Sequence, residues 1–454
     1  MTDTERIKRA FAKRKIDKVK LGGFDGDGIL RGKYVSREKC LSTIESGLGF
    51  CDVIFGWDSA DVLYDQNAVT GSHTGYPDLA ARIDTSTFCV LPWEPNTAFF
   101  LLDFYRADGA PLGTSPRYVL RRVIERAEWM NYSIRAAVEF EYWFFREDPH
   151  SARAKRFAGL IPLTPGMFGY SVLRASVDSE LSHAIMDGAR DLGIELEGHH
   201  TETGPGVYES AICADSALRA ADKAALFKTA VKIIAQKRGL MATFMAKWNP
   251  QLPGSSGHVH QSLGDIQGKR NLFYQREKAG KASMSTLMKH YIAGQLALMP
   301  ELTVMFQPTI NSYKRTAPGT RSWAPANVTW GLDNRTTGLR AIVAGPKATR
   351  VEHRLPGADA NPYLSLAASI ASGLYGIEAG LEIPAATGNA YASDAGPLPR
   401  SLKEANALFS KSEAARKSFG DEFVDFFSMT RDWEVRQFER AVTDWELERY
   451  FESI

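Results

Sequence analysis

The segment "AAVEFEYWFF", residues 136–145, has the alternating pattern of a β-strand with one apolar and one acidic face. The apolar face would carry Val138, Phe140 and Tyr142, and the acidic face Glu139 and Glu141. Residues two apart on a strand lie about 7 Å apart on the same face, so the two carboxylates repel each other. Such a face is either solvated or neutralised by a cation. The aromatic residues around it favour a hard cation bound by oxygen ligands.

The composition excludes two classes of partner. The chain has 454 residues, of which 44% are hydrophobic, and this length allows two to four domains or one large unit with a small partner. Its 55 Lys and Arg residues nearly balance its 53 Asp and Glu residues. The net charge of +2 therefore gives no general attraction to nucleic acid or to an anionic membrane.

The cysteines and the hydropathy pattern predict a cytoplasmic location. The four cysteines show no CxxC spacing, which favours reduced thiols in the cytosol. The N-terminal stretch is charged and has no apolar core, so it does not resemble a secretory signal. No window approaches the roughly 18 uninterrupted apolar residues that a membrane span requires.

The chain divides into a small N-terminal unit and a much larger second unit, with the boundary near residue 112. Residues 17–104 consist of short apolar segments separated by turn residues, which predicts a β-rich domain with one helix near residues 37–46. Ser115 followed by Pro116 indicates a helix start. The second unit is expected to be α+β or α/β, with longer helices near residues 176–193, 214–238 and 283–298.

Two further segments bring together side chains that bind metals. In "HHTETGPGVYES", residues 199–210, a Gly-Pro-Gly turn brings Glu202 and Glu209 together, although an ordinary polar loop would look the same. In "GHVHQS", residues 257–262, two histidines share one face of an expected strand, a geometry suited to metal or phosphate contacts.

Arginines are concentrated between residues 315 and 354. They are Arg315, Arg335, Arg340, Arg350 and Arg354. Divalent cations combined with an arginine clamp are the apparatus of phosphoryl transfer, in which neutralisation of charge does most of the work. The sequence contains no GxxxxGK[ST] motif, so it is not a P-loop enzyme.

Taken together, these motifs resemble the glutamine synthetase family of the bacterial type I kind. The motifs follow the family's order over nearly the whole chain: ExE on a strand, HHxE with a second Glu, PGxxxHxHxS, NSYKR, NRx(4)R and PKx(2)RxExR. The resemblance implies an α+β fold, with an N-terminal β-grasp domain over residues 1–112 and a catalytic domain over residues 113–454. It also implies a homo-oligomer, a dodecamer of two hexameric rings, whose active sites lie between neighbouring subunits.

The resemblance assigns roles to individual residues. The expected ligands of Mg²⁺ or Mn²⁺, two or three ions per site, are Glu141, Glu202 and Glu209 for one ion and Glu139, His258 and Glu352 for another. The residues expected near ATP are His260, Ser262, Lys347 and Arg350. Arg335 and Arg340 are expected to hold the transferring phosphoryl group. Glutamate is expected to bind Arg315 and Arg354, under a closing loop that contains Gly254.

The implied reaction is phosphorylation of the γ-carboxylate of L-glutamate by ATP, followed by attack of an amine. The sequence departs from the family in the flap "PGTRSWAP", residues 318–325. Glutamine synthetases have a Glu here that helps to deprotonate ammonium, whereas this chain has Trp323 and no acid. This change resembles the ligases that use polyamines, alkylamines, ethanolamine or aromatic amines.

The acceptor side is the least determined part of the expected site. The acceptor pocket is expected to include Trp323, Tyr170, Trp57 and Asp61, with Trp330 as a further possible wall. Asp58 is expected to act as the catalytic acidic residue contributed to a neighbouring subunit. Trp323 has two interpretations, because it is either an aromatic wall for an organic amine or a buried packing residue.

Three functions follow from the sequence, and we favour the first. The chain is a ligase of glutamate and an organic amine, a glutamine synthetase that uses ammonia, or a catalytically silent scaffold of the same fold. All the candidate metal ligands are retained, which argues against the scaffold, because a scaffold need not keep acids that repel each other.

Overall fold

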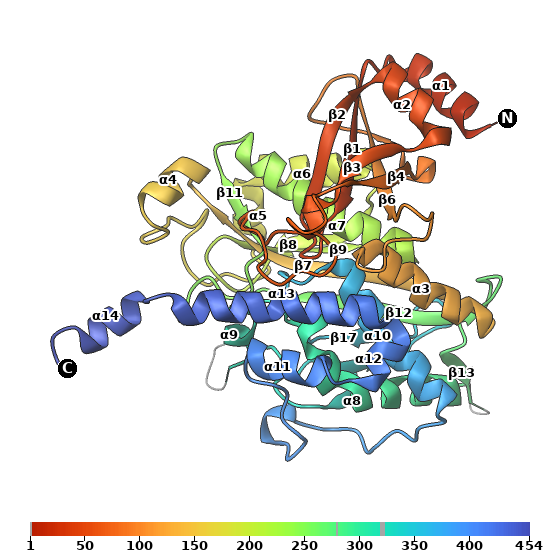
Figure 1. Ribbon diagram of the computed structural model, residues 1–454. Coiled ribbons are helices and arrows are strands. Elements are labelled where there is room, and N and C mark those ends of the chain that lie inside the picture. Colours follow the sequence, from red (N-terminus) through yellow and green to blue (C-terminus); the bar gives the residue numbers. More distant parts are fainter. Residues whose placement is uncertain (1, 278–279, 318–322) are drawn as a thin grey trace.

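A computed structural model describes residues 2–277, 280–317 and 323–454. It contains two large sheets, one in the red and orange N-terminal region and one in the yellow-to-blue remainder of the chain (Figure 1). The predicted α+β fold class is confirmed, since a small N-terminal domain built on a sheet precedes a larger domain of mixed helices and strands.

The N-terminal sheet has the strand order β2-β1-β6-β4-β3, and β5 pairs with β6. Its strands are β1 (Lys18–Phe24), β2 (Leu30–Ser36), β3 (Leu48–Cys51), β4 (Asp78–Ile83), β5 (Cys89–Val90) and β6 (Thr97–Tyr105). Helices α1 (Asp3–Arg14) and α2 (Arg37–Ser46) pack with Val19 and Leu21 of β1 in one core. The opposite face of β1 turns toward the rest of the molecule, where Phe24 joins the main core.

The second sheet has the order β15-β16-β17-β12-β7-β9-β8, with β10 and β11 also paired to β7. Its strands are β7 (Tyr132–Phe145), β8 (Leu196–Thr201), β9 (Val207–Ile212), β10 (Asp215–Ser216), β11 (Met241–Thr243), β12 (Gly257–Asp265), β15 (Trp330–Leu332), β16 (Leu339–Ile342) and β17 (Arg350–His353). The strand predicted over residues 136–145 is confirmed and forms most of β7. Val138, Phe140 and Tyr142 are buried in the core, while Glu139 and Glu141 lie on the other face.

The main helices of the second domain pack against this core. They are α3 (Pro116–Trp129), α6 (Ser179–Asp191), α7 (Ala217–Gln236), α8 (Thr286–Phe306) and α10 (Pro362–Glu378). Pro116 occupies the first turn of α3 as predicted, although the Ser115 side chain makes no capping hydrogen bond. The structure extends α8 beyond the predicted end at residue 298. The helix continues through Pro300 because Leu302, Met305 and Phe306 keep its apolar face in the core.

The remaining elements lie at the edges of the second domain or between its main elements. They are α4 (Pro149–Ala154), α5 (Val172–Val177), α9 (Ser312–Thr316), α11 (Leu402–Phe409), α12 (Glu413–Phe419), α13 (Asp421–Arg440), α14 (Asp444–Tyr450) and the hairpin of β13 (Tyr274–Arg276) and β14 (Ala282–Met284). Long α13 crosses the front of the molecule and leads to α14, which projects away from it (Figure 1).

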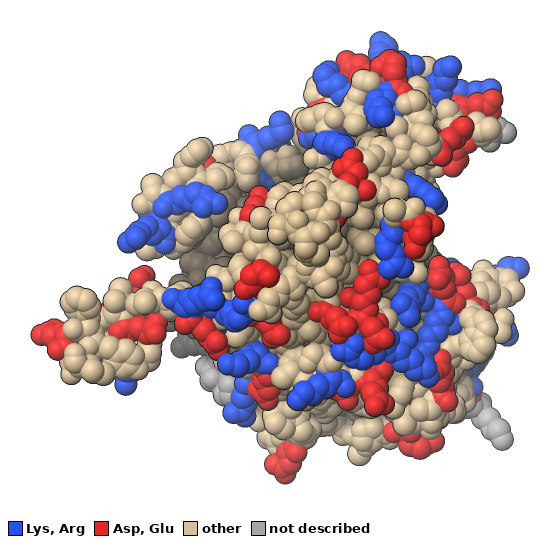
Figure 2. Space-filling model, in the orientation of Figure 1, with Lys and Arg blue, Asp and Glu red and all other residues tan. Residues whose placement is uncertain are grey.

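The surface agrees with the balanced composition. On the face in Figure 2, basic and acidic side chains are interspersed, and neither sign covers the face alone. Across the described residues, no helix combines the length and the apolar character needed to cross a bilayer.

A buried ionic network joins the two domains at Arg117 on α3. Its guanidinium donates to Asp222 on α7 at 2.8 and 3.0 Å, to Asp103 on β6 at 2.6 Å and to Asp84 at 2.7 Å. The Tyr363 hydroxyl also donates to Asp222, at 2.7 Å. The side chains of Arg117 and Asp222 are almost completely buried, so the Asp222 carboxylate depends on Arg117 for compensation of its charge.

Replacing Arg117 with Ala should destabilise the fold strongly, because Asp222 would keep a buried charge without its cation. We expect a loss of about 3–5 kcal/mol in the free energy of unfolding, measured by urea denaturation. The control is Arg190→Ala, which breaks a solvent-exposed pair with Asp187 and should cost about 1 kcal/mol or less. Equal losses for the two variants would contradict the network's role.

Candidate active site

The polar side chains of the second sheet lie in rows that the strand register defines. Directly opposite residues of antiparallel strands project to the same face. Glu141 on β7 lies opposite Glu209 on β9, which lies opposite His200 on β8. Two residues along β7, Glu139 lies opposite His258 on β12. Pairing therefore places acids and histidines from distant segments side by side.

The rows continue toward the other edge of the sheet. Two residues along β12, His260 lies opposite Glu352 on β17, which lies opposite Arg340 on β16. Because each row is displaced from the previous one, the polar side chains form a diagonal band from β8 to β16. The opposite face of β7 and β12 is apolar and packs on the helices, so the band can face only away from the core.

The first cluster in the band contains His200, Glu202 and Glu209. One ligand atom from each of these side chains lies within 4.8 Å of the others. The Nε2 atom of His200 is 3.2 Å from Oε1 of Glu209. Glu141 lies beside them in the same row, and its Oε2 accepts a hydrogen bond of 2.7 Å from the backbone N–H of Ser256. The three predicted ligands of one metal are thus brought together.

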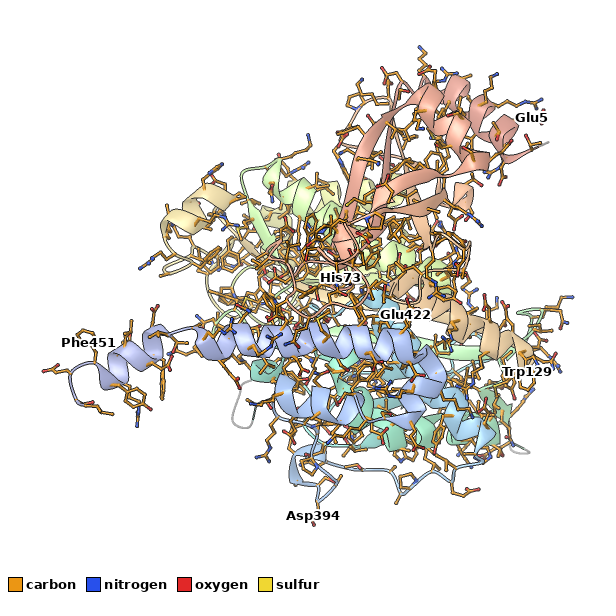
Figure 3. All side chains as sticks on the ribbon, in the orientation of Figure 1. Glu5, His73, Trp129, Asp394, Glu422 and Phe451 are labelled. Atoms are coloured by element: carbon orange, nitrogen blue, oxygen red, sulfur yellow. The ribbon has the colours of Figure 1, made fainter. Side chains whose placement is uncertain are left out.

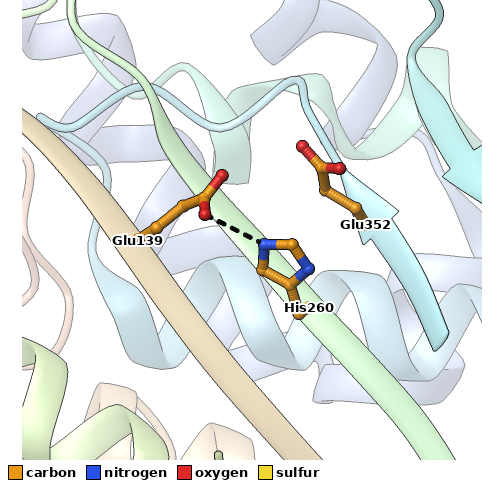
Figure 4. Close-up of side chains that lie close together, drawn as sticks. All are labelled: Glu139, His260 and Glu352. Carbon is orange, nitrogen blue, oxygen red and sulfur yellow. Dashed lines mark ion pairs between the residues drawn. The ribbon is translucent and has the colours of Figure 1, made fainter. Parts of the chain in front are cut away.

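The second cluster contains Glu139, His260 and Glu352, which Figure 4 shows converging from three strands. His260 Nε2 is 3.4 Å from Glu139 Oε2. His258 also reaches this cluster, with its Nδ1 atom 2.8 Å from Glu139 and 3.5 Å from Glu352. The predicted ligands Glu139, His258 and Glu352 are therefore adjacent. His260, which was predicted to lie near ATP, is also part of this cluster.

In the first cluster, burial and charge repulsion determine the direction of the carboxyl pKa shifts. Burial, followed by the neighbouring Glu209 carboxylate, raises the pKa of Glu141 to about 8. Burial also raises the pKa of Glu209, although a hydrogen bond from His200 opposes this shift. The same hydrogen bond raises the pKa of His200. Acids crowded in this way are stabilised by any cation that binds among them.

In the second cluster, the histidines lower the pKa values of the neighbouring carboxyl groups. Burial opposes ionisation of Glu139, yet the charge of His260 and the hydrogen bond from His258 hold its pKa well below the usual range. Despite burial, the same two histidines hold the pKa of Glu352 at about 2. Burial lowers the pKa of His258 to about 4, which keeps its imidazole neutral and able to ligate a metal.

Both clusters fit divalent cations on the chemistry of their donors. Carboxylate oxygens suit Mg²⁺, Ca²⁺ and Mn²⁺, and imidazole nitrogen is a common ligand of transition metals. The Nε2 atom of His258 is buried and has no hydrogen-bond partner within the described parts of the chain. A buried nitrogen without a partner, next to carboxylates that repel each other, is expected of a metal site, because the ion would bind the nitrogen and offset the repulsion.

Arginines surround the second cluster. Arg340 donates to Glu352 at 2.8 Å and to Asp333 at 2.6 and 2.9 Å, and Arg354 also donates to Glu352. The Nε–H of Arg350 donates to His260 Nδ1 at 3.2 Å. These arginine side chains therefore lie on the side of the cluster away from His200. An anion bound against the band would contact them there.

The predicted glutamate-binding residues Arg315 and Arg354 are also adjacent. Arg315 is fully buried and donates to the carbonyl oxygens of Leu355 at 2.9 Å and Arg354 at 3.1 Å, and to Ser256 Oγ at 3.1 Å. A Cβ atom on Gly254 would lie 2.7 Å from Arg315 Cγ, so the loop can approach this arginine only as glycine. Arg315 is thus rigidly placed below the loop.

Three other predicted residues lie at the periphery of the band. Ser262 follows His260 on β12 and is half-buried, and Lys347 is exposed on the turn before β17. Arg335 is exposed and lines an open hollow of about 470 Å³ together with Asp333 and Asn334. The geometry leaves all three facing solvent beside the clusters.

The expected acceptor residues do not form one pocket in the described chain. The ring of Tyr170 stacks on His200, with ring centroids 4.4 Å apart, so Tyr170 covers the first cluster. Trp323 is 66% exposed and does not pack in the core of this chain. Trp330 is buried in β15, and its Nε1–H donates to the Pro384 carbonyl, so the suggestion that it lines the pocket is wrong. Residues 318–322 of the flap lie outside the described residues.

The N-terminal loop that carries the remaining acceptor residues is anchored on its own chain. One oxygen of Asp58 accepts from the backbone N–H groups of Ala60 and Val62, and the other accepts from the Trp433 indole at 2.9 Å. Arg31 binds Asp61 at 2.7 Å and lies over the Trp57 ring. Within this chain, the described contacts of Asp58, Asp61 and Trp57 involve neither metal cluster.

Sequence reasoning missed His200 as a member of the first cluster. The signal was present, because His200 and Glu202 are two residues apart and thus share a face where the strand continues. The register of β8 against β9, which places His200 opposite Glu209, was not available from the sequence.

Comparison with known proteins identifies the family. Residues 113–450 match the model of the glutamine synthetase catalytic domain. The chain belongs to the glutamine synthetase family. Its members use ATP and divalent metals, which agrees with the two clusters and the arginines beside them.

Individual relatives are similar over nearly the whole chain. "Type-1 glutamine synthetase 2" of Dictyostelium discoideum is 49% identical, over 96% of this chain and 84% of its own. "Glutamate--isopropylamine ligase" of a Pseudomonas species is 42% identical, over 99% and 98%. A solved GmaS–ADP complex superimposes with a TM-score of 0.85 at 27% identity, over 99% of this chain and 100% of that one.

Replacing Glu141 with Gln should separate metal affinity from stability. Glutamine keeps an oxygen for the Ser256 N–H but removes one of the repelling charges. We expect the melting temperature in EDTA to stay the same or rise. The apparent affinity for a divalent cation, measured by metal-dependent thermal stabilisation, should fall by about tenfold or more.

The matched control is Glu197→Gln, which removes an exposed carboxylate from neighbouring strand β8. It should leave both the melting temperature and the metal response unchanged. An unchanged metal response in Glu141→Gln would show that this cluster does not bind the ion.

Proposed function

We propose that the protein is an ATP-dependent ligase that joins the γ-carboxylate of L-glutamate to an organic amine. The observation that carries this proposal is the complete set of acids, histidines and arginines in one band, combined with Trp323 in place of the flap acid. The 42% identity to a glutamate–isopropylamine ligase over nearly both chains supports it.

The reaction has two steps. A γ-carboxylate oxygen of glutamate attacks the terminal phosphorus of ATP, which forms γ-glutamyl phosphate and releases ADP. The amine nitrogen then attacks the γ-carbonyl carbon, phosphate leaves with the bond to oxygen, and the nitrogen loses a proton. Because water would hydrolyse the acyl phosphate, the site must exclude water while it admits the amine.

We propose Mg²⁺ or Mn²⁺ as the cations, two or three per site. The first cluster would hold its ion with Glu141, Glu202 and Glu209, and the second with Glu139, His258 and Glu352. When bound, the ions neutralise phosphate charge during transfer. His200 lies near enough to add an imidazole to the first cluster, and His260 to the second.

The arginines divide the anionic substrates between them. Arg340 and Arg335 would neutralise the transferring phosphoryl group, since Arg340 already bridges to Glu352 of the second cluster. Arg350, linked to His260, would position ATP with Ser262 and Lys347. Arg315 and Arg354, fixed below the Gly254 loop, would hold glutamate.

The acceptor end of the site would favour an organic amine over ammonia. Tyr170 covers His200, and an exposed Trp323 offers an aromatic surface that a bare ammonium ion does not need. In the proposed assembly, Trp57, Asp58 and Asp61 of a neighbouring subunit complete this end. Ammonia as the acceptor is the second candidate, favoured by the 49% identity to a protein named a glutamine synthetase.

A panel of amines tests the proposal directly. Phosphate release with saturating ATP, glutamate and metal should give a higher kcat/KM for at least one organic amine than for ammonia. A higher kcat/KM for ammonia than for every amine would identify a glutamine synthetase. Absence of glutamate-dependent turnover with all acceptors would point to a silent scaffold.

Replacing Trp323 with Glu should shift the preference toward ammonia. The carboxylate would restore the acid that helps to deprotonate ammonium and would remove the aromatic surface. We expect the ratio of kcat/KM for ammonia to that for the best organic amine to rise by about tenfold, which corresponds to about 1.4 kcal/mol of differential transition-state binding.

The control for this variant is Trp129→Glu, at another strongly exposed tryptophan on the end of α3. It should leave the ratio unchanged. If Trp323→Glu retained the selectivity of the original chain, the acceptor assignment of Trp323 would be wrong.

We propose a homo-oligomer, a dodecamer of two hexameric rings. The C-terminal segment supports association, because α14 projects from the body and ends near the labelled Phe451 (Figure 3). Trp445 of α14 and Phe451 and Ile454 beyond it are exposed. Exposed apolar side chains on a projecting segment are typical of an interface. Sedimentation velocity should show one species of about twelve subunits, and a monomer would contradict this assembly.

We also propose domain limits at residues 1–112 and 113–454 and a cytoplasmic location. Strand β6 ends at Tyr105 and α3 begins at Pro116, which leaves a short connection for the boundary. The four cysteines are free thiols, as in a reducing compartment. Limited proteolysis should cut first within residues 106–115, and cell fractionation tests the location.

A further inference from the structure

A second cavity lies between the N-terminal sheet and helix α7. Its volume is about 340 Å³, within the range of small-molecule sites. The walls come from β1, β2 and the segment after β5 on one side, and from α7 on the other. None of the metal-cluster or arginine residues described above lines it.

The strand alternation explains the hollow on the sheet side. Val19 and Leu21 of β1 face the N-terminal core, so Lys20 and Gly22 lie on the opposite face of the strand, toward α7. The register pairs Gly22 with Gly32 at the middle of this face, between the pairs Phe24–Leu30 and Lys20–Tyr34. The two glycines lie in the floor of the cavity, where a Cβ atom on Gly32 would meet the Leu21 carbonyl oxygen at 2.5 Å, and this floor and α7 bound a slot.

The slot is narrow at its floor. A Cβ atom on Gly22 would lie 3.0 Å from Leu30 Cδ1 and 3.3 Å from the Phe99 ring, both of which line the cavity. Leu30 and Phe99 therefore already fill the space directly above Gly22, and the free volume lies between these side chains and α7. The apolar rings and methyl groups around the glycines form a wall that suits a flat molecule.

The helix side has the same character. Leu226, Thr229, Ala230 and Ile233 follow the spacing of one helical face and line the cavity. Cavities with apolar walls stay dry and accept apolar molecules, because water inside finds too few partners. Two polar groups interrupt the apolar lining: Thr229 on α7, and the buried Trp93 indole N–H, which has no hydrogen-bond partner among the described residues.

Both lysines of the lining are already engaged, since Lys33 donates to the Gly49 carbonyl at 2.9 Å. Lys20 pairs with Glu94, and the Tyr34 hydroxyl donates to the other oxygen of Glu94 at 2.7 Å. A charged ligand would lose its hydration without gaining an unpaired counter-ion, which is costly. A neutral ligand avoids this cost.

We propose that this slot is a binding site for a compact uncharged molecule with one ring and a hydroxyl group. The ring lies between Leu30 and Phe99 on the sheet side and α7, and the hydroxyl pairs with Thr229. ATP, glutamate and a protonated amine are all charged, so the site does not take the substrates of the proposed reaction. A ligand here contacts both domains and stabilises their packing.

Benzyl alcohol and toluene are the matched probes, since they differ by one hydroxyl, and benzylammonium is the charged control. Binding to the full-length protein is measured by isothermal titration and by thermal stabilisation, and a crystal soak locates the probe. Benzyl alcohol should bind saturably and about fivefold more tightly than toluene. Benzylammonium should not bind at this site.

Two variants on α7 test the location. Thr229→Val keeps the shape but removes the hydroxyl, so the preference for benzyl alcohol over toluene should disappear. Thr229→Phe should fill the slot and reduce the affinity for both probes by about tenfold or more. Gln236→Phe, on an exposed position of the same helix outside the lining, should bind like the original protein.

Three results would overturn the site: no saturable binding of benzyl alcohol, equal binding by Thr229→Phe, or equal binding of benzylammonium in the slot. Ligase activity is measured in parallel and should persist in every α7 variant. Because probe binding does not require turnover, loss of the ligase assignment would leave this site standing, and the reverse also holds.

Discussion

The pairing of β7 with β9 and β12 is the constraint on which the site depends. It places Glu141 beside Glu209 and Glu139 beside His258, although these residues come from distant parts of the chain. A shift of one residue in either register would turn the acids into the apolar core. The buried side chains of Val138, Phe140 and Tyr142 on the opposite face oppose such a shift, so core packing fixes the geometry of the polar band.

The band concentrates charge of both signs, and the two clusters balance it differently. In the first cluster, carboxylates outnumber their partners and the pKa of Glu141 rises to about 8. In the second, His260, His258 and Arg354 hold the pKa of Glu352 low despite its burial. Side chains that would weaken an ordinary sheet are tolerated here because cations, from the protein or from solution, offset their repulsion. The proposed acceptor residues Tyr170 and Trp323 lie outside this balance.

Much of the site was predictable because short motifs keep ligands on one face of one strand. The ExE and HxH spacings fix where Glu139, Glu141, His258 and His260 project, whatever surrounds them. Contacts between strands were harder to predict from the sequence. The place of His200 in the first cluster required knowledge of the pairing of β8 with β9. Burial was least predictable, since Trp330 is packed in the core whereas Trp323, in the same segment of sequence, is exposed.

The sequence by itself determined the alternation of β7 and the residue types of the site, because these follow from local periodicity and composition. The α+β class followed from the resemblance to a known family, since the local pattern alone left α+β and α/β open. Only the tertiary structure decided which strands are neighbours, that Arg117 joins the two domains, and that Asp58 is bound to Trp433 of its own chain. It alone also opened the slot between Gly22, Gly32 and α7. The physical reason is that pairing and packing join residues far apart in sequence, whose proximity no local pattern encodes.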